Sequence, residues 1–289
     1  MQATRPSRTA FQNALFRALE ACKPASSRVA DDTLAVRFLP PEFRLLAGVA
    51  RAPGGRRLIE TVIDRRWPCV RGGVVARTRL IDETVTAELP QVRQALLLGA
   101  GFDSRACRLA GMATVTVFEV DHPATQAVKQ HVLRRTGAAP DVRFVPVVFG
   151  TDDLAQKLAA AGFVEGEQTL VLWEGVTNYL DPAAVDATFR FLASVLGPGS
   201  PVVFTYVDRR MLDGSAAFAG AETTLRAVRR VGEPFTFGLD PEKASGYLAE
   251  RGFTLEWDTP VSDAAARVYP AGHCPTVPAY YHVAALRRA

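Results

Sequence analysis

Short apolar runs alternate with helix-like stretches over most of the chain after Pro90. The runs, rich in branched and aliphatic residues, cover positions 95–98, 115–118, 144–149, 170–173 and 202–207. Apolar residues at helical spacing separate several of them, at 123–136, 152–161 and 181–196. Such alternation is typical of βαβ units, in which helices cover both faces of a buried parallel sheet. The sequence therefore predicts an α/β fold with a mostly parallel, twisted sheet.

The flanking segments extend this prediction to the whole chain. Residues 9–22, 56–67 and 70–89 read as helices, whereas the tail predicts a helix near 240–251 and strands at 253–258 and 277–286. Pro146 predicts that its own strand lies at an edge of the sheet or carries a bulge. We expect one domain over residues 1–289, with a helical cap over 1–90 and a Rossmann-like core over 91–289.

Composition excludes several classes of protein. The 34 basic and 30 acidic side chains nearly balance and do not cluster, so we expect no nucleic-acid partner. No apolar stretch approaches the roughly 18 residues of a membrane span, and Arg17 and Glu20 interrupt the first apolar segment, so we expect a cytoplasmic protein without a secretory signal. The cysteines lie too far apart to indicate a metal site or a disulfide framework, and we expect buried thiols at positions 22, 69, 107 and 274.

A glycine-rich turn follows the first apolar run directly. Gly99 and Gly101 would let the backbone approach a ligand closely at the start of a helix. Ser104 replaces the third glycine of the dinucleotide-binding fingerprint, which weakens the case for a pyrophosphate site. The turn therefore indicates either a nucleotide-type ligand or an ordinary tight connection between strand and helix.

Acidic side chains mark the ends of two further strands. Glu119 and Asp121 end the second run, where a carboxylate can accept from both hydroxyls of a ribose, and Glu174 ends the fourth run. Alternation along a strand places Glu119 and Asp121 on the same face, so both are candidates for the pocket. Upstream, Arg77 and Arg79 form either a solvated helix face or a guanidinium fork for a free carboxylate.

Six motifs together resemble the leucine carboxyl methyltransferase family, in particular its bacterial S-adenosylmethionine-dependent members. In order and spacing they cover nearly the whole chain. The motifs are Pro6-Ser7-Arg8-Thr9-Ala10, Arg77-Thr78-Arg79-x-x-Asp82, Leu98-Gly99-Ala100-Gly101-x-Asp103-Ser104-Arg105, Phe118-Glu119-Val120-Asp121-x-Pro123, Glu174-Gly175-x-x-x-Tyr179-Leu180 and Pro234-Phe235-Thr236-Phe237-Gly238-Leu239.

The resemblance implies a class I methyltransferase fold and S-adenosyl-L-methionine as cofactor. It implies that Arg77 holds the methionine carboxylate and that Glu174 lies by the methionine end. Gly99 and Gly101 would line the methionine and ribose region, and Asp121 would bind the ribose hydroxyls.

One position departs from the family pattern. Where the family usually shows an Asp-Leu pair beside the adenine, this chain has Val148 and Phe149. Either Asp152 takes over after a small shift in register, or the amino group of the adenine is held differently.

The histidines bear on which acceptor receives the methyl group. His122 and His131 read as surface or packing residues, and no histidine is one of the matched residues of the motifs. His273 is an acceptor-site candidate that is more simply explained as structural. Because a carboxylate is already ionised at neutral pH and needs no base, this favours a carboxylate over a hydroxyl. We expect a small-molecule acceptor, such as a polyketide-like acid.

Two other functions remain open. An NAD-dependent oxidoreductase would use the glycine turn and the acid after the second strand, but it requires neither Arg77 nor Glu174. A methyltransferase-like protein that binds the cofactor without catalysis would fit the altered position at Val148.

Overall fold

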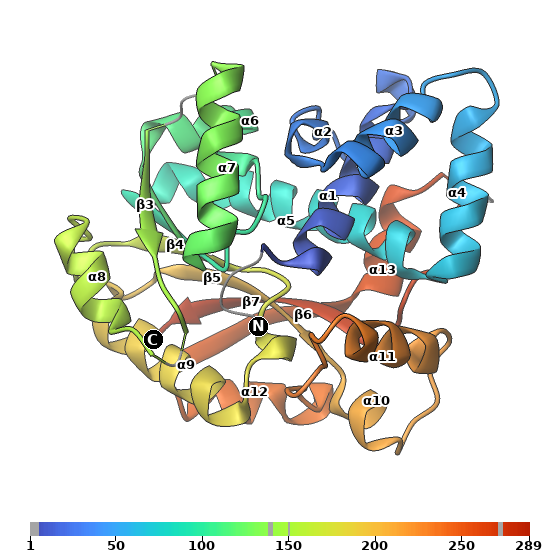
Figure 1. The fold of residues 1–289 in the computed structure, drawn as a ribbon. Helices are drawn as coiled ribbons and strands as arrows, with labels where there is room; N and C mark the ends of the chain where they lie inside the picture. The colour runs from blue at the N-terminus through green and yellow to red at the C-terminus, as the bar shows by residue number, and fades with distance from the viewer. Residues whose placement is uncertain (1–5, 138–140, 150, 271–273) are drawn as a thin grey trace.

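A seven-stranded sheet organises the computed structural model, which describes residues 6–137, 141–149, 151–270 and 274–289 (Figure 1). Within these residues the strand order is β3-β2-β1-β4-β5-β7-β6. The bounds are β1 Gln94–Leu98, β2 Thr116–Asp121, β3 Val142–Pro146, β4 Thr169–Trp173, β5 Pro201–Val207, β6 Phe253–Pro260 and β7 Tyr281–Arg288. Strands β1 to β5 pair in parallel, whereas β7 runs antiparallel to both of its neighbours. The predicted α/β fold with a mostly parallel sheet is confirmed.

Helices cover both faces of this sheet, and helices from the amino-terminal part of the chain build a cap (Figure 1). Their bounds are α1 Arg8–Ala21, α2 Ala35–Phe38, α3 Pro41–Val49, α4 Gly55–Arg66, α5 Val70–Glu88, α6 Arg105–Arg108, α7 Pro123–Thr136, α8 Leu154–Ala160, α9 Pro182–Val195, α10 Arg209–Asp213, α11 Ala221–Arg230, α12 Ala244–Ala249 and α13 Val261–Val268. Short 3-10 turns add η1 Ala25–Ser27, η2 Leu89–Gln91, η3 Ala110–Thr114, η4 Thr177–Tyr179 and η5 Pro241–Lys243.

Strand β1 shows why the apolar runs are continuous. Leu96 and Leu98 pack on one face of the sheet against α8, α9 and α12, and Ala95 and Leu97 pack on the other face against α5 and α13. All of β1 is buried. A strand covered on both sides has no solvent-facing positions, so polar residues do not alternate with apolar ones.

The cap has a core of its own. Helix α1 begins at the Ser7 cap, whose side chain accepts a hydrogen bond from the amide of Ala10. Its buried face, which includes Phe16 and Leu19, packs with residues of α2, α3 and α4. Phe102 from the turn after β1 joins the same cluster, so the cap is packed directly onto the sheet edge where the strands end.

Several details refine the sequence-based picture. Pro146 lies in β3, an edge strand, as predicted. Helices α11 and α13 were not predicted. In the case of α13, the helix follows β6 without a glycine or loop to mark its start. The expectation of buried thiols was correct for Cys69 alone: Cys22 and Cys107 are half-buried, and Cys274 is exposed. None of the described helices is both long and apolar enough to cross a membrane.

The strand order reverses between β1 and β4, because β1 connects outward to β2 while β4 continues in the other direction. At such a switch point the loops after the two strands diverge and leave a crevice at the carboxyl edge of the sheet. The residues after β1, β2 and β4 meet there.

Candidate active site

The turn after β1 depends on glycine at two positions. Gly99 has a φ of 64°, and a Cβ there would lie 2.3 Å from the Cγ2 atom of Val176. Gly101 has a φ of 48°, and its amide donates a hydrogen bond to Oδ2 of Asp121. Positive φ and close contact both select glycine, so the turn brings backbone atoms next to the end of β2.

Asp121 ends β2 and faces the crevice. Its other oxygen, Oδ1, accepts from the amide of His122 at 2.5 Å. Burial raises the pKa of Asp121, and the hydrogen bonds from the Gly101 and His122 amides act in the opposite direction by stabilising the carboxylate. The carboxylate is thus fixed in place by two backbone donors.

Glu119 lies outside the crevice, although it shares a face of β2 with Asp121. Its Oε2 atom pairs with Nζ of Lys129 on α7 at 2.6 Å, and both side chains are almost fully buried. Burial raises the pKa of Glu119 to about 7, against the opposing effect of Lys129. The carboxylate is buried beneath α7 and is not among the residues that line the crevice.

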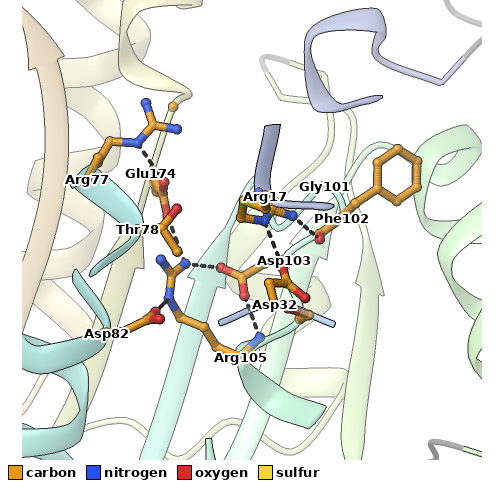
Figure 2. Close-up of polar contacts among 12 residues, drawn as sticks. Arg17, Asp32, Arg77, Thr78, Asp82, Gly101, Phe102, Asp103, Arg105 and Glu174 are labelled. Carbon is orange, nitrogen blue, oxygen red and sulfur yellow. Dashed lines mark hydrogen bonds and ion pairs between the residues drawn. The ribbon is translucent and has the colours of Figure 1, made fainter. Parts of the chain in front are cut away.

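Arg77 on α5 and Glu174 after β4 form a buried ion pair, with 2.7 Å between Nε and Oε1. Figure 2 shows the two terminal nitrogens of Arg77 pointing away from Glu174, and neither has a hydrogen-bond partner among the described residues. The guanidinium also lies 5.0 Å from the ring centre of Tyr281. The side chain is therefore held on one side and keeps two donors for a ligand.

Arg105 supports this pair from below (Figure 2). Its guanidinium contacts Asp103, lies 2.7 Å from Oε2 of Glu174, and donates to Asp82 at 2.7 Å. Burial alone would raise the pKa of Glu174, but Arg105 and Arg77 together lower it. Glu174 therefore stays ionised. Sequence reasoning noted Arg105 within a motif and assigned it no role.

The position that departs from the family pattern has a clear arrangement. Oδ2 of Asp152 accepts from the amide of Val148 at 2.9 Å and from Nζ of Lys157 at 2.8 Å. Asp152 therefore closes its own loop, while Val148 and Phe149 line the crevice. An apolar wall stands where the family usually places an acid.

The histidines are distributed around the sheet. Nδ1 of His122 caps α7 by accepting from Ala124. His131 is exposed on α7, and His282 on β7 pairs with Asp258 at 3.0 Å. The candidate His273 lies outside the described residues.

Two adjoining cavities occupy the crevice. The larger, of about 540 Å³, is lined by the turn after β1 and by Asp121, Glu174, Val148 and Phe149. We call it the large cavity. The small cavity, of about 170 Å³, lies beside it. The residues that line both are Thr9, Asn13, Arg77, Gly175 and Tyr179.

The small cavity is largely apolar. Its aromatic lining comprises Phe16, Trp67, Tyr179, Phe235, Tyr280 and Tyr281. These residues come from helix α1, the connections after α4, β4 and α11, and the chain at the start of β7. Because no local motif joins such distant segments, the sequence alone did not reveal this cavity.

A hydrogen bond joins two segments that line the large cavity. Oγ1 of Thr9 donates to Glu233 at 2.6 Å and so ties α1 to the segment after α11. Both residues line the large cavity. This contact joins the cap to the segment after α11 beside the large cavity.

A doubly wound sheet with a glycine turn, an acidic strand end and a cavity at its switch point defines a Rossmann-like, nucleotide-binding type of α/β protein. The chain belongs to the leucine carboxyl methyltransferase family, whose profile matches residues 10–193.

Individual relatives agree with this family. A protein from Mycobacterium sp. (strain JLS), provisionally named an S-adenosyl-L-methionine-dependent methyltransferase, is 36% identical over 64% of this chain. The match spans 62% of that relative's length. A protein of the same provisional name from Mycobacteroides abscessus is 34% identical over 71% of this chain and 67% of its own length.

A solved structure shows the same fold. An O-methyltransferase family protein from Burkholderia thailandensis superposes with a TM-score of 0.51 over 90% of this chain and 77% of its own, at 11% identity. The fold is that of the class I methyltransferases, as the motifs predicted.

Proposed function

We propose that this protein is an S-adenosyl-L-methionine-dependent O-methyltransferase that acts on a small-molecule acid. The observation that carries the proposal is the placement of Arg77 and Asp121 on one cavity. Two guanidinium nitrogens of Arg77 without a hydrogen-bond partner in the described part of the chain, and the backbone-anchored carboxylate of Asp121, line the same cavity of about 540 Å³. A ligand with a free carboxylate at one end and a ribose further along would match both groups.

The cavity lining fits the other parts of this cofactor. Glu174 is held ionised and would face the ammonium group of the methionine end. Gly99 and Gly101 bring backbone atoms to the middle of the cavity. Val148 and Phe149 would pack against the adenine ring. Glu119 and Asp152 have other partners and are not part of this assignment.

The small cavity would hold the acceptor. When bound, the cofactor supplies a methyl group on a positively charged sulfur, so the task of this chain is to position the acceptor and exclude water. The carbon–sulfur bond breaks as a carbon–oxygen bond forms, and a carboxylate acceptor releases no proton. The apolar lining and the Thr9–Glu233 hydrogen bond suit this task.

The lining of the small cavity favours a carboxylate over a hydroxyl. Among the described residues, no histidine, aspartate or glutamate lines it. Burial raises the pKa of Tyr179, which makes its phenol a poor base at neutral pH. A hydroxyl acceptor would need such a base. A ring-containing acid, such as a polyketide-like metabolite, fits the aromatic walls.

Thermal shift with two ligands separates this proposal from an oxidoreductase. We expect S-adenosylhomocysteine to raise the melting temperature and NAD to leave it unchanged. Stabilisation by NAD alone would contradict the proposal. Transfer of label from methyl-labelled S-adenosyl-L-methionine to an aromatic acid separates an enzyme from a protein that only binds the cofactor.

A further inference from the structure

Two arginines line the small cavity and not the large one. Arg66 is the last residue of α4, and Arg230 is the last residue of α11. Both are exposed, and neither forms an ion pair within the described residues. No carboxylate from the described residues lines this cavity. Among the residues that the structure describes, the charged ones in its lining are Arg66, Arg230 and Arg77.

Arg66 is also restrained. Its guanidinium lies 5.4 Å from the ring centre of Trp67, which itself packs edge-on against Phe16. Stacking on an indole limits the motion of the side chain and leaves its hydrogen-bond donors free at the edge of the guanidinium plane. Arg66 is thus an exposed arginine that contacts an aromatic ring beside an apolar cavity.

The polar residues of the small cavity fall into two groups, those at the junction with the large cavity and those away from it. The junction with the large cavity is formed by Thr9, Asn13, Arg77, Gly175 and Tyr179, so an acceptor must place its reacting oxygen there. The pair Arg66 and Arg230 is absent from that junction.

We propose that the acceptor carries a second anionic group, held by Arg66 and Arg230 away from the reacting oxygen. This inference rests on the proposed function and specifies its substrate class: an amphipathic, ring-containing acid whose unmethylated anionic group anchors it. Holding the unmethylated anion at Arg66 and Arg230 would leave the reacting carboxylate at the junction with the large cavity.

Equilibrium binding tests this anchor with two probes of similar shape. The probes are 2-naphthoate, an aromatic anion, and 2-naphthalenemethanol, its neutral counterpart, each titrated in the presence of S-adenosylhomocysteine. We expect the anion to bind the wild-type protein about tenfold more tightly, and this preference to shrink as salt is raised. Equal binding of the two probes, or no binding of 2-naphthoate at millimolar concentration, would overturn the inference.

Four substitutions assign the effect to these side chains. We expect Arg66→Gln and Arg230→Gln each to weaken 2-naphthoate binding about three- to tenfold and to leave 2-naphthalenemethanol binding unchanged. The matched controls are Arg65→Gln and Arg229→Gln, exposed neighbours on the same helices that line neither cavity. Controls that weaken binding as much as the test variants would also overturn the inference.

Measuring cofactor binding distinguishes a failure of the proposed function from a failure of the anionic anchor. All four variants should bind S-adenosylhomocysteine as the wild type does, because neither test residue lines the large cavity. Failure of the wild type to bind S-adenosylhomocysteine would refute the proposed function. Normal cofactor binding without discrimination between the probes would refute only the anionic anchor.

Discussion

Nε of Arg77 donates to Oε1 of Glu174 across 2.7 Å, joining helix α5 of the cap to the end of strand β4. The same carboxylate accepts from Arg105 through its other oxygen. Glu174 thus orients Arg77, which faces the large cavity, and also pairs with Arg105, which does not line that cavity. The site is positioned by this shared carboxylate as much as by the glycine turn.

Glu174→Gln should therefore weaken cofactor binding without abolishing it. Glutamine can still accept one hydrogen bond, but the charge that holds Arg77 and Arg105 is lost. We expect S-adenosylhomocysteine affinity to fall about tenfold and the free energy of unfolding to fall by about 1–3 kcal/mol. Glu83→Gln is the control, since Glu83 is exposed and pairs only with Arg79. Unchanged affinity in Glu174→Gln would contradict this role.

Asp121→Ala tests the assignment of the ribose ligand. The change removes a charged acceptor from the cavity, and we expect cofactor binding to weaken by about 1.5–3 kcal/mol in calorimetry. Stability should change little, because the freed Gly101 and His122 amides lie beside a water-accessible cavity. A variant that binds the cofactor normally would show that Asp121 does not contact it.

The buried pair of Glu119 and Lys129 should matter for stability and not for binding. Lys129→Met leaves the Glu119 carboxylate buried without its charged partner, which we expect to cost about 3–5 kcal/mol of unfolding free energy above pH 7, where Glu119 is ionised. The double variant Glu119→Gln/Lys129→Met should recover most of this loss, and its cofactor affinity should match the wild type. A large drop in affinity in the double variant would return Glu119 to the binding site.

The raised pKa of Glu119 gives the same pair a pH dependence. The pKa rises from its ordinary value of 4.5 to about 7, so the folded protein holds this proton more tightly than the unfolded chain does. The contribution of Glu119 to stability is thus fully present below about pH 4.5 and is lost as the pH rises through about 7. Denaturant unfolding of wild type and double variant should show their stability difference shifting toward the double variant across this window. A pH-independent difference would contradict it.

The rate of methyl transfer should be insensitive to pH. A carboxylate acceptor is ionised throughout, so we expect turnover at saturating substrates to vary little between about pH 6 and 9. His273→Ala should leave turnover within about tenfold, because no proton must be removed. A rate that climbs through the pKa of a histidine, with a larger loss in His273→Ala, would identify a hydroxyl acceptor instead.

The site residues at strand ends were predictable because their placement depends only on the adjacent sequence. Gly99, Asp121 and Glu174 each follow a buried apolar run, and parallel strands bring such positions to one edge. Glu119 fitted the same rule, yet its partner Lys129 lies ten residues further on in α7 and covers it. Which helix covers a side chain is a property of packing that strand periodicity does not contain.

The acceptor side could not be predicted for a related reason. Arg66 and Arg230 end two helices more than 160 positions apart, and no local sequence pattern relates them. Only the docking of α11 near the cap places them on one cavity with Trp67. Asp152 differs again, because its short loop satisfies the carboxylate locally and leaves Val148 and Phe149 to face the crevice.

Calorimetric titration of S-adenosylhomocysteine into the wild type, Arg77→Lys and Arg79→Lys tests the central claim most directly. The account predicts micromolar binding by the wild type, about 8 kcal/mol, and a loss of about 1–3 kcal/mol in Arg77→Lys, since an ammonium cannot offer two fixed donors to a carboxylate. Arg79→Lys should bind like the wild type, because Arg79 is exposed and pairs with Glu83. No binding at millimolar ligand, or a loss in Arg79→Lys with none in Arg77→Lys, would contradict the account.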